Sequence, residues 1–259
     1  MTRTSTGRGW NIVLGIIAGL LILLFIGEIA VRALIAQQIR AGISDSAPES
    51  SDMREDASVG FGASPVLLGL ARGKLQHINI EVPSTLVPDS DEIIGNPPAT
   101  IDATGFVLDQ DNPTADELIL HTEIPQALLR DMLQQELRHS LNEAQDGRFA
   151  EYDEILTVSD VGTDPAAGTF TVTFSNGAFG VELRPDVSEN GQIAFTAEST
   201  QILGRNLPDF FSEAVSNALQ KGLNEDVVGP MKIQQFQVID NGFRITVAGE
   251  NVQLSELPV

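Results

Sequence analysis

The hydrophobic pattern of the chain begins with an uninterrupted apolar run. Residues 10–27, WNIVLGIIAGLLILLFIG, contain no charged side chain. A helix of this length would measure about 27 Å at roughly 1.5 Å per residue, which matches the hydrocarbon thickness of a bilayer. Arg3 and Arg8 precede the run, and flanking positive charge favours the cytoplasmic side. The pattern predicts a cytoplasmic tip and transmembrane signal anchor over residues 1–27, in a single-pass plasma-membrane protein whose remaining chain lies outside.

A cleaved secretory signal peptide is the alternative interpretation of the same run. Such peptides usually have an apolar core of about 7–15 residues, which is shorter than this run. No clear small-x-small cleavage site lies between the run and the charged segment EIAVR at residues 28–32. We therefore favour the uncleaved anchor, with secretion after cleavage as the alternative. In both cases the domain that follows faces the exterior.

Helical periodicity continues beyond the anchor. Apolar side chains recur at three- and four-residue spacing within residues 28–43, namely at Ile29, Ala33, Ala36, Ile39 and Ile43. We expect this helix to pack on its own domain rather than to lie on the membrane surface. Residues 44–58 are polar and contain proline, which is typical of a linker. The pattern thus predicts a juxtamembrane helix and linker over 28–58 and one domain over 59–259.

The rest of the chain alternates between strand-like and helix-like patterns. Period-two alternation predicts strands over 75–82, 99–109, 117–124, 154–161, 168–175, 177–185 and 192–203. Helical spacing predicts a short helix over 65–75 and two long amphipathic helices over 125–141 and 208–223. A hairpin is predicted over 231–249, because its Asp240-Asn241-Gly242 turn is a strong hairpin signal. Mostly antiparallel strands with a few helices indicate the α+β class.

Composition narrows the classes of function. The formal net charge of −21 argues against nucleic-acid partners, because phosphate backbones are bound by an excess of Lys and Arg. The same charge disfavours broad electrostatic docking onto an anionic membrane surface. The chain has no cysteine, which removes disulfides, thiolate catalysis and cysteine-based metal sites. Hydrophobic residues make up 42%, so the bulk of the chain is globular rather than disordered.

No set of residues in the sequence indicates catalysis. His77, His121 and His139 do not have metal-ligand spacing, and a structural or surface role is the favoured interpretation of each. Ser64 lacks the G-x-S-x-G elbow of serine hydrolases, and the sequence contains no glycine-rich phosphate loop. We therefore predict that the protein is not an enzyme and uses no cofactor and no metal.

Several features taken together resemble a known family. The pattern consists of a proline-led short helix, a glycine, an alternating strand and a C-terminal glycine hairpin, carried by Pro65, Leu67, Gly73, residues 75–82 and Asn241-Gly242-Phe243. Over residues 28–254 this arrangement is similar to the LmeA-like family of extracytoplasmic phospholipid-binding proteins of the actinobacterial cell envelope. The resemblance implies a fold like that of tubular lipid-binding domains, in which a strongly bent antiparallel sheet wraps around long amphipathic helices.

The resemblance also implies a function. It implies binding of phospholipid and support for the assembly of envelope lipoglycans of the lipomannan type. The implied partners are phospholipid, the membrane that the anchor crosses once, and envelope-biosynthesis proteins. A non-catalytic scaffold or interaction protein of the cell envelope is the alternative, and an enzyme that uses paired carboxylates as acid and base is a third hypothesis.

The candidate lipid contacts come from the short helix region and from the apolar stripes of the two long helices. They are Phe61, Pro65, Leu67, Leu68, Leu128, Leu129, Met132, Leu133, Phe210, Phe211, Val215 and Leu219. A groove between such helices and a sheet would hold acyl chains, because each buried methylene contributes roughly 0.8 kcal/mol. Core packing is the alternative for each position, since stripes at helical spacing are usually plain core. Arg72 and Lys74 are the candidate headgroup contacts, with ordinary solvent-facing charges as the alternative.

Overall fold

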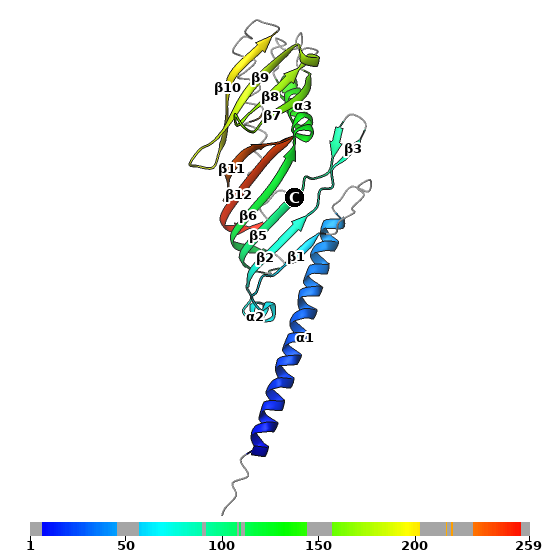
Figure 1. Cartoon of the computed structure of the whole chain (residues 1–259), viewed down its shortest axis with the longest axis vertical. Helices are drawn as coiled ribbons and strands as arrows, with labels where there is room; N and C mark the ends of the chain where they lie inside the picture. The colour runs from blue at the N-terminus through cyan, green and yellow to red at the C-terminus, as the bar shows by residue number, and fades with distance from the viewer. Residues whose placement is uncertain are drawn as a thin grey trace, which may run out of the picture.

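The protein is elongated, with a long N-terminal helix that runs beside and then beyond a β-rich body (Figure 1). The computed structural model describes residues 7–45, 57–89, 92–107, 109, 112–143, 157–202, 216, 219 and 230–254. A six-stranded sheet lies beside the upper part of the helix, and a four-stranded sheet lies at the far end of the body. The body therefore extends away from the apolar N-terminal end of the chain.

The helix α1 (Gly7–Asp45) is continuous through the predicted end of the anchor at Gly27. Beyond that point it packs on the body, as the periodicity predicted. Its body-facing side chains are one buried alanine and three partly buried aliphatic residues, namely Ala36, Val31, Ile35 and Ile39. One long helix thus serves both as the apolar run and as one wall of the body.

The predicted stripe of this helix was wrong at two positions. Ile29 is 55% exposed and Ala33 is also exposed. Glu28 and Arg32 bond to the body instead, and a helix turns about 100° per residue, so the neighbours of these two residues point elsewhere. Ile43, the last member of the predicted stripe, lies outside the described side chains.

The six-stranded sheet has the order β1-β2-β5-β6-β12-β11. Its strands are β1 (Ser58–Gly60), β2 (Leu75–Val82), β5 (Ala99–Phe106), β6 (Thr114–Pro125), β11 (Met231–Ile239) and β12 (Gly242–Gln253). All neighbouring pairs are antiparallel. The predicted C-terminal hairpin is confirmed, and its turn residue Asn241 has the positive φ of 60° that favours Asn and Gly. A short helix, α2 (Val66–Ala71), precedes β2.

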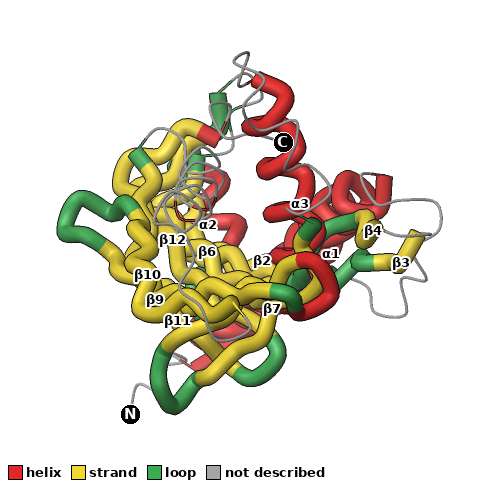
Figure 2. The backbone as a smooth tube through the Cα atoms, turned by 90° about the horizontal axis from the view of Figure 1, so that it is seen from above, coloured by secondary structure: helices red, strands yellow, loops and turns green. Residues whose placement is uncertain are grey.

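The four-stranded sheet has the order β10-β9-β8-β7 and is also antiparallel. Its strands are β7 (Val158–Asp164), β8 (Thr169–Phe174), β9 (Phe179–Val187) and β10 (Ile193–Ile202), with a 3-10 turn, η1 (Ser175–Gly177), after β8. The helix α3 (Gln126–Glu143) follows β6 and lies against β7. Figure 2 shows the strands of the two main sheets as a curved layer, with α3 and the upper part of α1 on its other side.

A small hairpin, β3 (Val87–Asp89) and β4 (Glu92–Ile94), stands beside the two main sheets. The Ile93 amide donates to Asp131 Oδ2 on α3 at 2.9 Å, which ties the hairpin to that helix. Residues 83–98 carried no strand prediction, because two strands this short leave too few positions for a period to be recognised.

Aromatic side chains join the two main sheets. Phe170 from β8 contacts Phe195 from β10 and Phe243 from β12, with ring centroids 5.8 and 5.1 Å apart. Phe236 from β11 completes the group, at 5.5 Å from Phe243 and 5.9 Å from Phe195. These edge-to-face and tilted contacts are the arrangements that aromatic rings prefer. Both sheets therefore share one hydrophobic core.

The predicted α+β class with mostly antiparallel strands is confirmed. The strands are divided among three sheets rather than forming a single one. The second long helix, predicted over 208–223, lies outside the described residues except for Ser216 and Leu219, which are both helical. The wrapping of a strongly bent sheet around two long helices remains a prediction.

Candidate functional site

One face of the six-stranded sheet, here called the inner face, carries apolar side chains in cross-strand rows. Side chains alternate between the two faces of a strand, so residues paired across strands share a face. The first row is Ile78, Ala103, Leu118, Gly249 and Met231, and the second is Ile80, Ile101, Leu120, Val247 and Ile233. The register therefore assembles a continuous aliphatic surface from strands that are far apart in sequence.

The two rows are covered to different extents. In the first row, Ile78 and Ala103 are each 2% exposed and Leu118 is 5% exposed. In the second row, Ile80, Ile101 and Leu120 are only partly buried, although they pack against the core. These three side chains lie directly opposite one another on β2, β5 and β6. We call them the half-buried row, and they form the candidate site.

The next row on the same face is also incompletely covered. Val82, Ala99 and Thr122 are paired across the same three strands, and each is partly exposed. The Thr122 hydroxyl donates to the Pro98 carbonyl at 2.9 Å, so its polar group is satisfied locally. The surface beside the half-buried row is thus compatible with an apolar ligand.

The outer face of the sheet has a different chemistry. It carries a cavity of about 820 Å³, and a second cavity of about 390 Å³ is lined both by outer-face residues and by Val82, Ala99 and Thr122; His121 lines both cavities. Charged side chains line them together with apolar residues. The charged ones are Glu81, Glu123 and Arg244 in the smaller cavity and Glu117, Lys232 and Glu250 in the larger, and the apolar ones include Val82, Pro83 and Pro98 in the smaller and Ile119, Pro230 and Ala248 in the larger. The charged side chains in these cavities disfavour an acyl chain, because charged groups lose hydration when an apolar ligand covers them.

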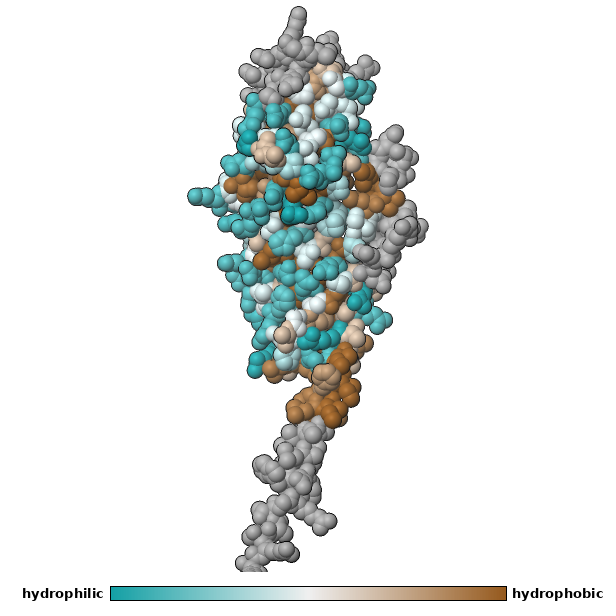
Figure 3. All heavy atoms as spheres, in the orientation of Figure 1, coloured by the Kyte–Doolittle hydropathy of each residue, from teal (hydrophilic) through white to brown (hydrophobic). Residues whose placement is uncertain are grey.

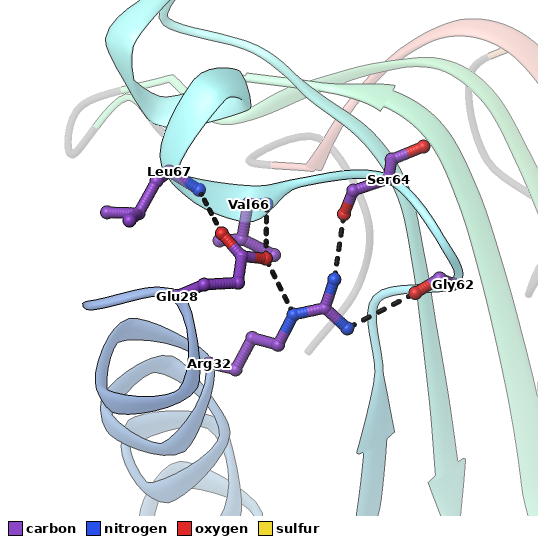
Figure 4. Close-up of polar contacts among 6 residues, drawn as sticks. All are labelled: Glu28, Arg32, Gly62, Ser64, Val66 and Leu67. Carbon is purple, nitrogen blue, oxygen red and sulfur yellow. Dashed lines mark hydrogen bonds and ion pairs between the residues drawn. The ribbon is translucent and has the colours of Figure 1, made fainter. Parts of the chain in front are cut away.

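A polar cluster, here called the bracket, attaches α2 to α1 (Figure 4). The Glu28 carboxylate accepts hydrogen bonds from the amides of Val66 at 2.6 Å and Leu67 at 2.9 Å. These amides belong to the first turn of α2, where backbone donors have no partner within the helix. Pro65, at the N-cap, makes no side-chain cap hydrogen bond, so the carboxylate of another helix supplies the cap.

Arg32 completes the bracket one turn further along α1. Its Nε donates to Glu28 Oε1 at 2.7 Å, and its two terminal nitrogens donate to the carbonyls of Gly62 at 3.2 Å and Ser64 at 2.8 Å. The guanidinium also lies 5.9 Å from the centre of the Phe61 ring. Two side chains of α1 thus hold the whole segment that leads into α2.

The bracket favours the ionised form of Glu28. Burial alone would raise the pKa of this carboxyl group. The hydrogen bonds from the Leu67 and Val66 amides and the charge of Arg32 outweigh burial and hold the pKa of Glu28 below its ordinary value of 4.5. The group is therefore a carboxylate at neutral pH, as the bracket requires.

The structure separates the predicted lipid contacts into two groups. Phe61, Leu67 and Leu68 lie at the corner between α1 and α2, with Phe61 buried, Leu67 partly buried and Leu68 exposed. The α3 residues lie at the far end of the body, where Leu128, Leu129 and Leu133 are buried in the core and Met132 is partly buried. Leu219 is buried as well, whereas Phe210, Phe211 and Val215 lie outside the described residues.

The two candidate headgroup contacts are in different situations. Arg72 follows α2 and is exposed. Lys74 forms an ion pair with Asp116 on β6, with 2.6 Å between Nζ and Oδ2. Arg72 is therefore better placed to meet a phosphate than Lys74, whose charge already has a partner.

The histidines have ordinary environments where they are described. His121 Nδ1 lies 3.0 Å from the Thr246 hydroxyl, and His77 Nε2 lies 3.8 Å from Asp102 Oδ1. His139 lies outside the described side chains. In the part of the chain that the structure describes, His, Asp and Glu form no group of three that could hold a metal ion.

Sequence reasoning did not single out the half-buried row. Alternation placed Ile80, Ile101 and Leu120 in predicted strands, but it did not identify their strand partners. The row exists only because Ile80 pairs with Ile101, and Ile101 with Leu120. A signal was present in the three alternating segments, and only the register could reveal it.

Comparison with known proteins assigns the chain to a family. No curated protein and no solved structure matches the chain. The LmeA-like phospholipid-binding family matches residues 26–248. This range begins two residues before Glu28 of the bracket and runs through most of β12, so it includes the half-buried row. The match covers most of the chain, and the protein therefore belongs to the LmeA-like phospholipid-binding family.

Proposed function

We propose that this protein is a non-catalytic phospholipid-binding protein, held by α1 at the outer face of the plasma membrane. In this proposal the acyl chains lie along the half-buried row of the inner face. The observation that carries it is that Ile80, Ile101 and Leu120 stay partly exposed beside the buried aliphatic first row of the same sheet face. The family description names binding rather than a reaction, which supports a non-catalytic role.

The energetics of such a site need no reactive group. Each methylene removed from water contributes roughly 0.8 kcal/mol. An acyl chain of about 16 carbons would gain on the order of 10 kcal/mol before the cost of ordering it. Exposed Arg72 would meet the lipid phosphate through a charge-assisted hydrogen bond.

The geometry of α1 supports an uncleaved anchor. Of the described side chains, those of Leu21–Ala41 form a helical segment long and apolar enough to cross a membrane. This segment includes Glu28 and Arg32, which are bonded to the body, so we place the membrane-embedded part before Glu28. Cleavage shortly beyond Glu28 would remove the bracket carboxylate, which favours the anchor over a signal peptide.

The biological role that we propose follows the family resemblance. The protein would hold phospholipid at the outer face of the membrane and so support the assembly of lipoglycans of the lipomannan type. Envelope-biosynthesis proteins would receive the lipid from it. A body that extends away from the membrane suits such a task, because its inner face lies between the bilayer and partners further out.

Photo-crosslinking tests the proposed binding site directly. Membranes that contain the full chain would be loaded with a phospholipid carrying a diazirine in its acyl chain, irradiated, and analysed by peptide mass spectrometry. We expect adducts on β2, β5 and β6 in addition to those on α1. L120Q should reduce the adducts on these strands several-fold, because a polar amide disfavours apolar contact.

The adjacent residue provides a matched control. Ile119 is also partly buried, lies on the same strand and lines a cavity of the outer face. I119Q should leave the adducts on the three strands unchanged. Adducts confined to α1, or an equal loss in both variants, would contradict the proposed site and favour the scaffold alternative.

A further inference from the structure

We infer that α2 is a second membrane contact, whose leucines enter the outer leaflet beside α1 and fix the height of the body above the bilayer; this rests on the anchoring proposed above. Leu68 is 46% exposed and Leu70 is 37% exposed. Among the described side chains, the other large hydrophobic residues with comparable exposure all belong to α1. Outside α1, the exposed leucines of the described residues are therefore concentrated on one short helix.

The position of α2 along α1 indicates that the bilayer covers the exposed leucines of α2. A Cβ atom added at Gly27 would lie 3.3 Å from Leu67 Cδ1, so α2 touches α1 where the charge-free run ends. The turns of α1 that precede Gly27 carry the exposed apolar residues Leu21–Ile26, and Ile29 and Leu34 beyond it are exposed as well. If residues 10–27 fill the hydrocarbon core, α2 lies at its outer boundary. Figure 3 shows hydrophobic surface gathered at the lower end of the body, where α1 leaves it.

The exposure of the two leucines does not reflect loose attachment of α2. The bracket holds its first turn, and Val66 is 3% exposed. A Cβ atom added at Gly69 would lie 2.9 Å from the Lys74 carbonyl oxygen and 3.1 Å from Leu75 Cδ2, so α2 also packs closely on the start of β2. The helix is a firmly held platform that presents leucines outward.

The charge of the chain agrees with an apolar contact rather than an electrostatic one. A net charge of −21 disfavours adsorption onto an anionic surface. At α2, however, Arg72 is exposed, while the charges of exposed Lys74 and Asp116 neutralise each other. Two leucines with a nearby arginine match the boundary between acyl chains and phosphates.

This contact would connect the bilayer with the lipid-binding face. The chain passes from α2 into β2, whose inner side chains include Ile78 and, two residues further, Ile80 of the half-buried row. Seating α2 in the leaflet thus places the near end of the inner face at the membrane surface. A lipid would then travel only a short distance between the bilayer and its site.

Single-cysteine spin labelling tests this inference on the full chain, which has no native cysteine. The variants L68C, F25C and E189C would carry a nitroxide and be reconstituted in vesicles of phosphatidylcholine and phosphatidylglycerol. Collision with oxygen and with a water-soluble nickel chelate would be measured for each. Glu189 is an exposed residue of the β9–β10 turn. We expect the ratio of oxygen to nickel collisions at Leu68 to be several-fold higher than the ratio at Glu189. It should approach the ratio at Phe25.

The outcomes separate the membrane contact from the proposed function. A bilayer-like ratio at Phe25 with a water-like ratio at Leu68 overturns the contact and leaves the anchor standing. Water-like ratios at both positions overturn the anchor and the contact together. The diazirine adducts on β2, β5 and β6 report lipid binding independently of both results.

The bracket provides a second variant for the same measurement. E28Q combined with L68C should lower the collision ratio at Leu68 at least two-fold, because the first turn of α2 loses its carboxylate partner. The ratio at Phe25 should not change in E28Q combined with F25C. An unchanged ratio at Leu68 would show that the bracket does not set the depth of α2.

Discussion

Side chains alternate between the two faces of the strands in both main sheets, but the inward-facing side chains are buried to different degrees. In the four-stranded sheet, Phe170 is 1% exposed, and Val172 and Phe174 are fully buried. In the six-stranded sheet, Ile80 and Leu120 occupy equivalent inward positions and remain partly exposed. The helix α3 packs directly on β7, whereas α1 contacts the edge strand β1 and the short helix α2. Burial is therefore decided by what covers a sheet, not by the pattern within its strands.

The largest effect on stability should come from the four-stranded sheet. F170A removes a ring that is buried between both sheets, so we expect a loss of about 3–5 kcal/mol in the free energy of unfolding. Guanidinium unfolding of the full chain in detergent, followed by far-UV circular dichroism, would measure it. T171A, at the next position on the opposite face, should cost about 1 kcal/mol or less. Equal losses of unfolding free energy in the two variants would show that the four-stranded sheet is not tightly packed.

Removing the carboxylate of the bracket should have the next largest effect. E28A leaves the amides of Val66 and Leu67 without their charged acceptor, and hydrogen bonds to charged groups are worth about 1.5–3 kcal/mol. We expect the protection of the α2 amides against hydrogen exchange to fall by a corresponding amount, with little change in β8. E198A, which removes an exposed partner of Arg184 on the four-stranded sheet, should leave α2 unchanged. Loss of protection throughout the chain would indicate that the bracket holds more than α2.

The half-buried row should respond weakly to truncation. L120A removes a side chain that already contacts solvent, so we expect a loss of only about 1 kcal/mol in the free energy of unfolding. L118A, two residues earlier on the same strand and buried, should cost about 2–4 kcal/mol. The same unfolding measurement applies to both. If L120A costs as much as L118A, the row is closed core and not a surface available to lipid.

Acid should weaken the bracket selectively. In the folded protein the pKa of Glu28 is held below its ordinary value of 4.5. The ionised carboxylate therefore stabilises the folded state fully when the pH is above the pKa of the unfolded chain. This stabilisation is lost as the pH falls through the lower pKa of the folded state. We expect α2 amides, corrected for intrinsic exchange rates, to lose protection below about pH 4.5. E28Q should show no such dependence at α2. A loss of protection in E28Q at the same pH would assign the effect to another group.

The smallest effect should come from the exposed ion pair beside α2. D116N removes the partner of Lys74, and exposed pairs contribute about 0.2–1 kcal/mol. We expect almost unchanged stability, measured by guanidinium unfolding. The freed lysine should increase binding of the full chain to a diazirine phospholipid with an anionic headgroup, relative to K74Q. Unchanged binding would leave Arg72 as the candidate headgroup contact.

Much of the local structure followed from short-range patterns. The predicted strand over residues 75–82 matches β2, and the predicted helix over residues 125–141 corresponds to α3. The hairpin near Asn241 followed from a turn whose backbone conformation few residues adopt. These elements were predictable because periodicity and turn chemistry are properties of neighbouring residues.

The candidate site was less predictable. The exposure of Ile29 depends on which face of α1 packs on the body, and the sequence near Ile29 does not determine that face. The ion pair of Lys74 depends on Asp116, which lies on β6 and is distant in sequence. The same applies to the leucines of α3, which the structure buries against the four-stranded sheet. Local patterns indicate that a side chain is on an apolar face, but not whether another element covers that face.

The sequence by itself determined the apolar N-terminal run, the α+β class, most strands and the resemblance to a phospholipid-binding family, because each depends on the order of neighbouring residues. Only the tertiary structure decided that Ile80, Ile101 and Leu120 form one row and that Glu28 holds α2 against α1. Strand register and side-chain coverage arise from contacts between distant segments. The free energy of those contacts depends on the whole fold, so no local pattern records it.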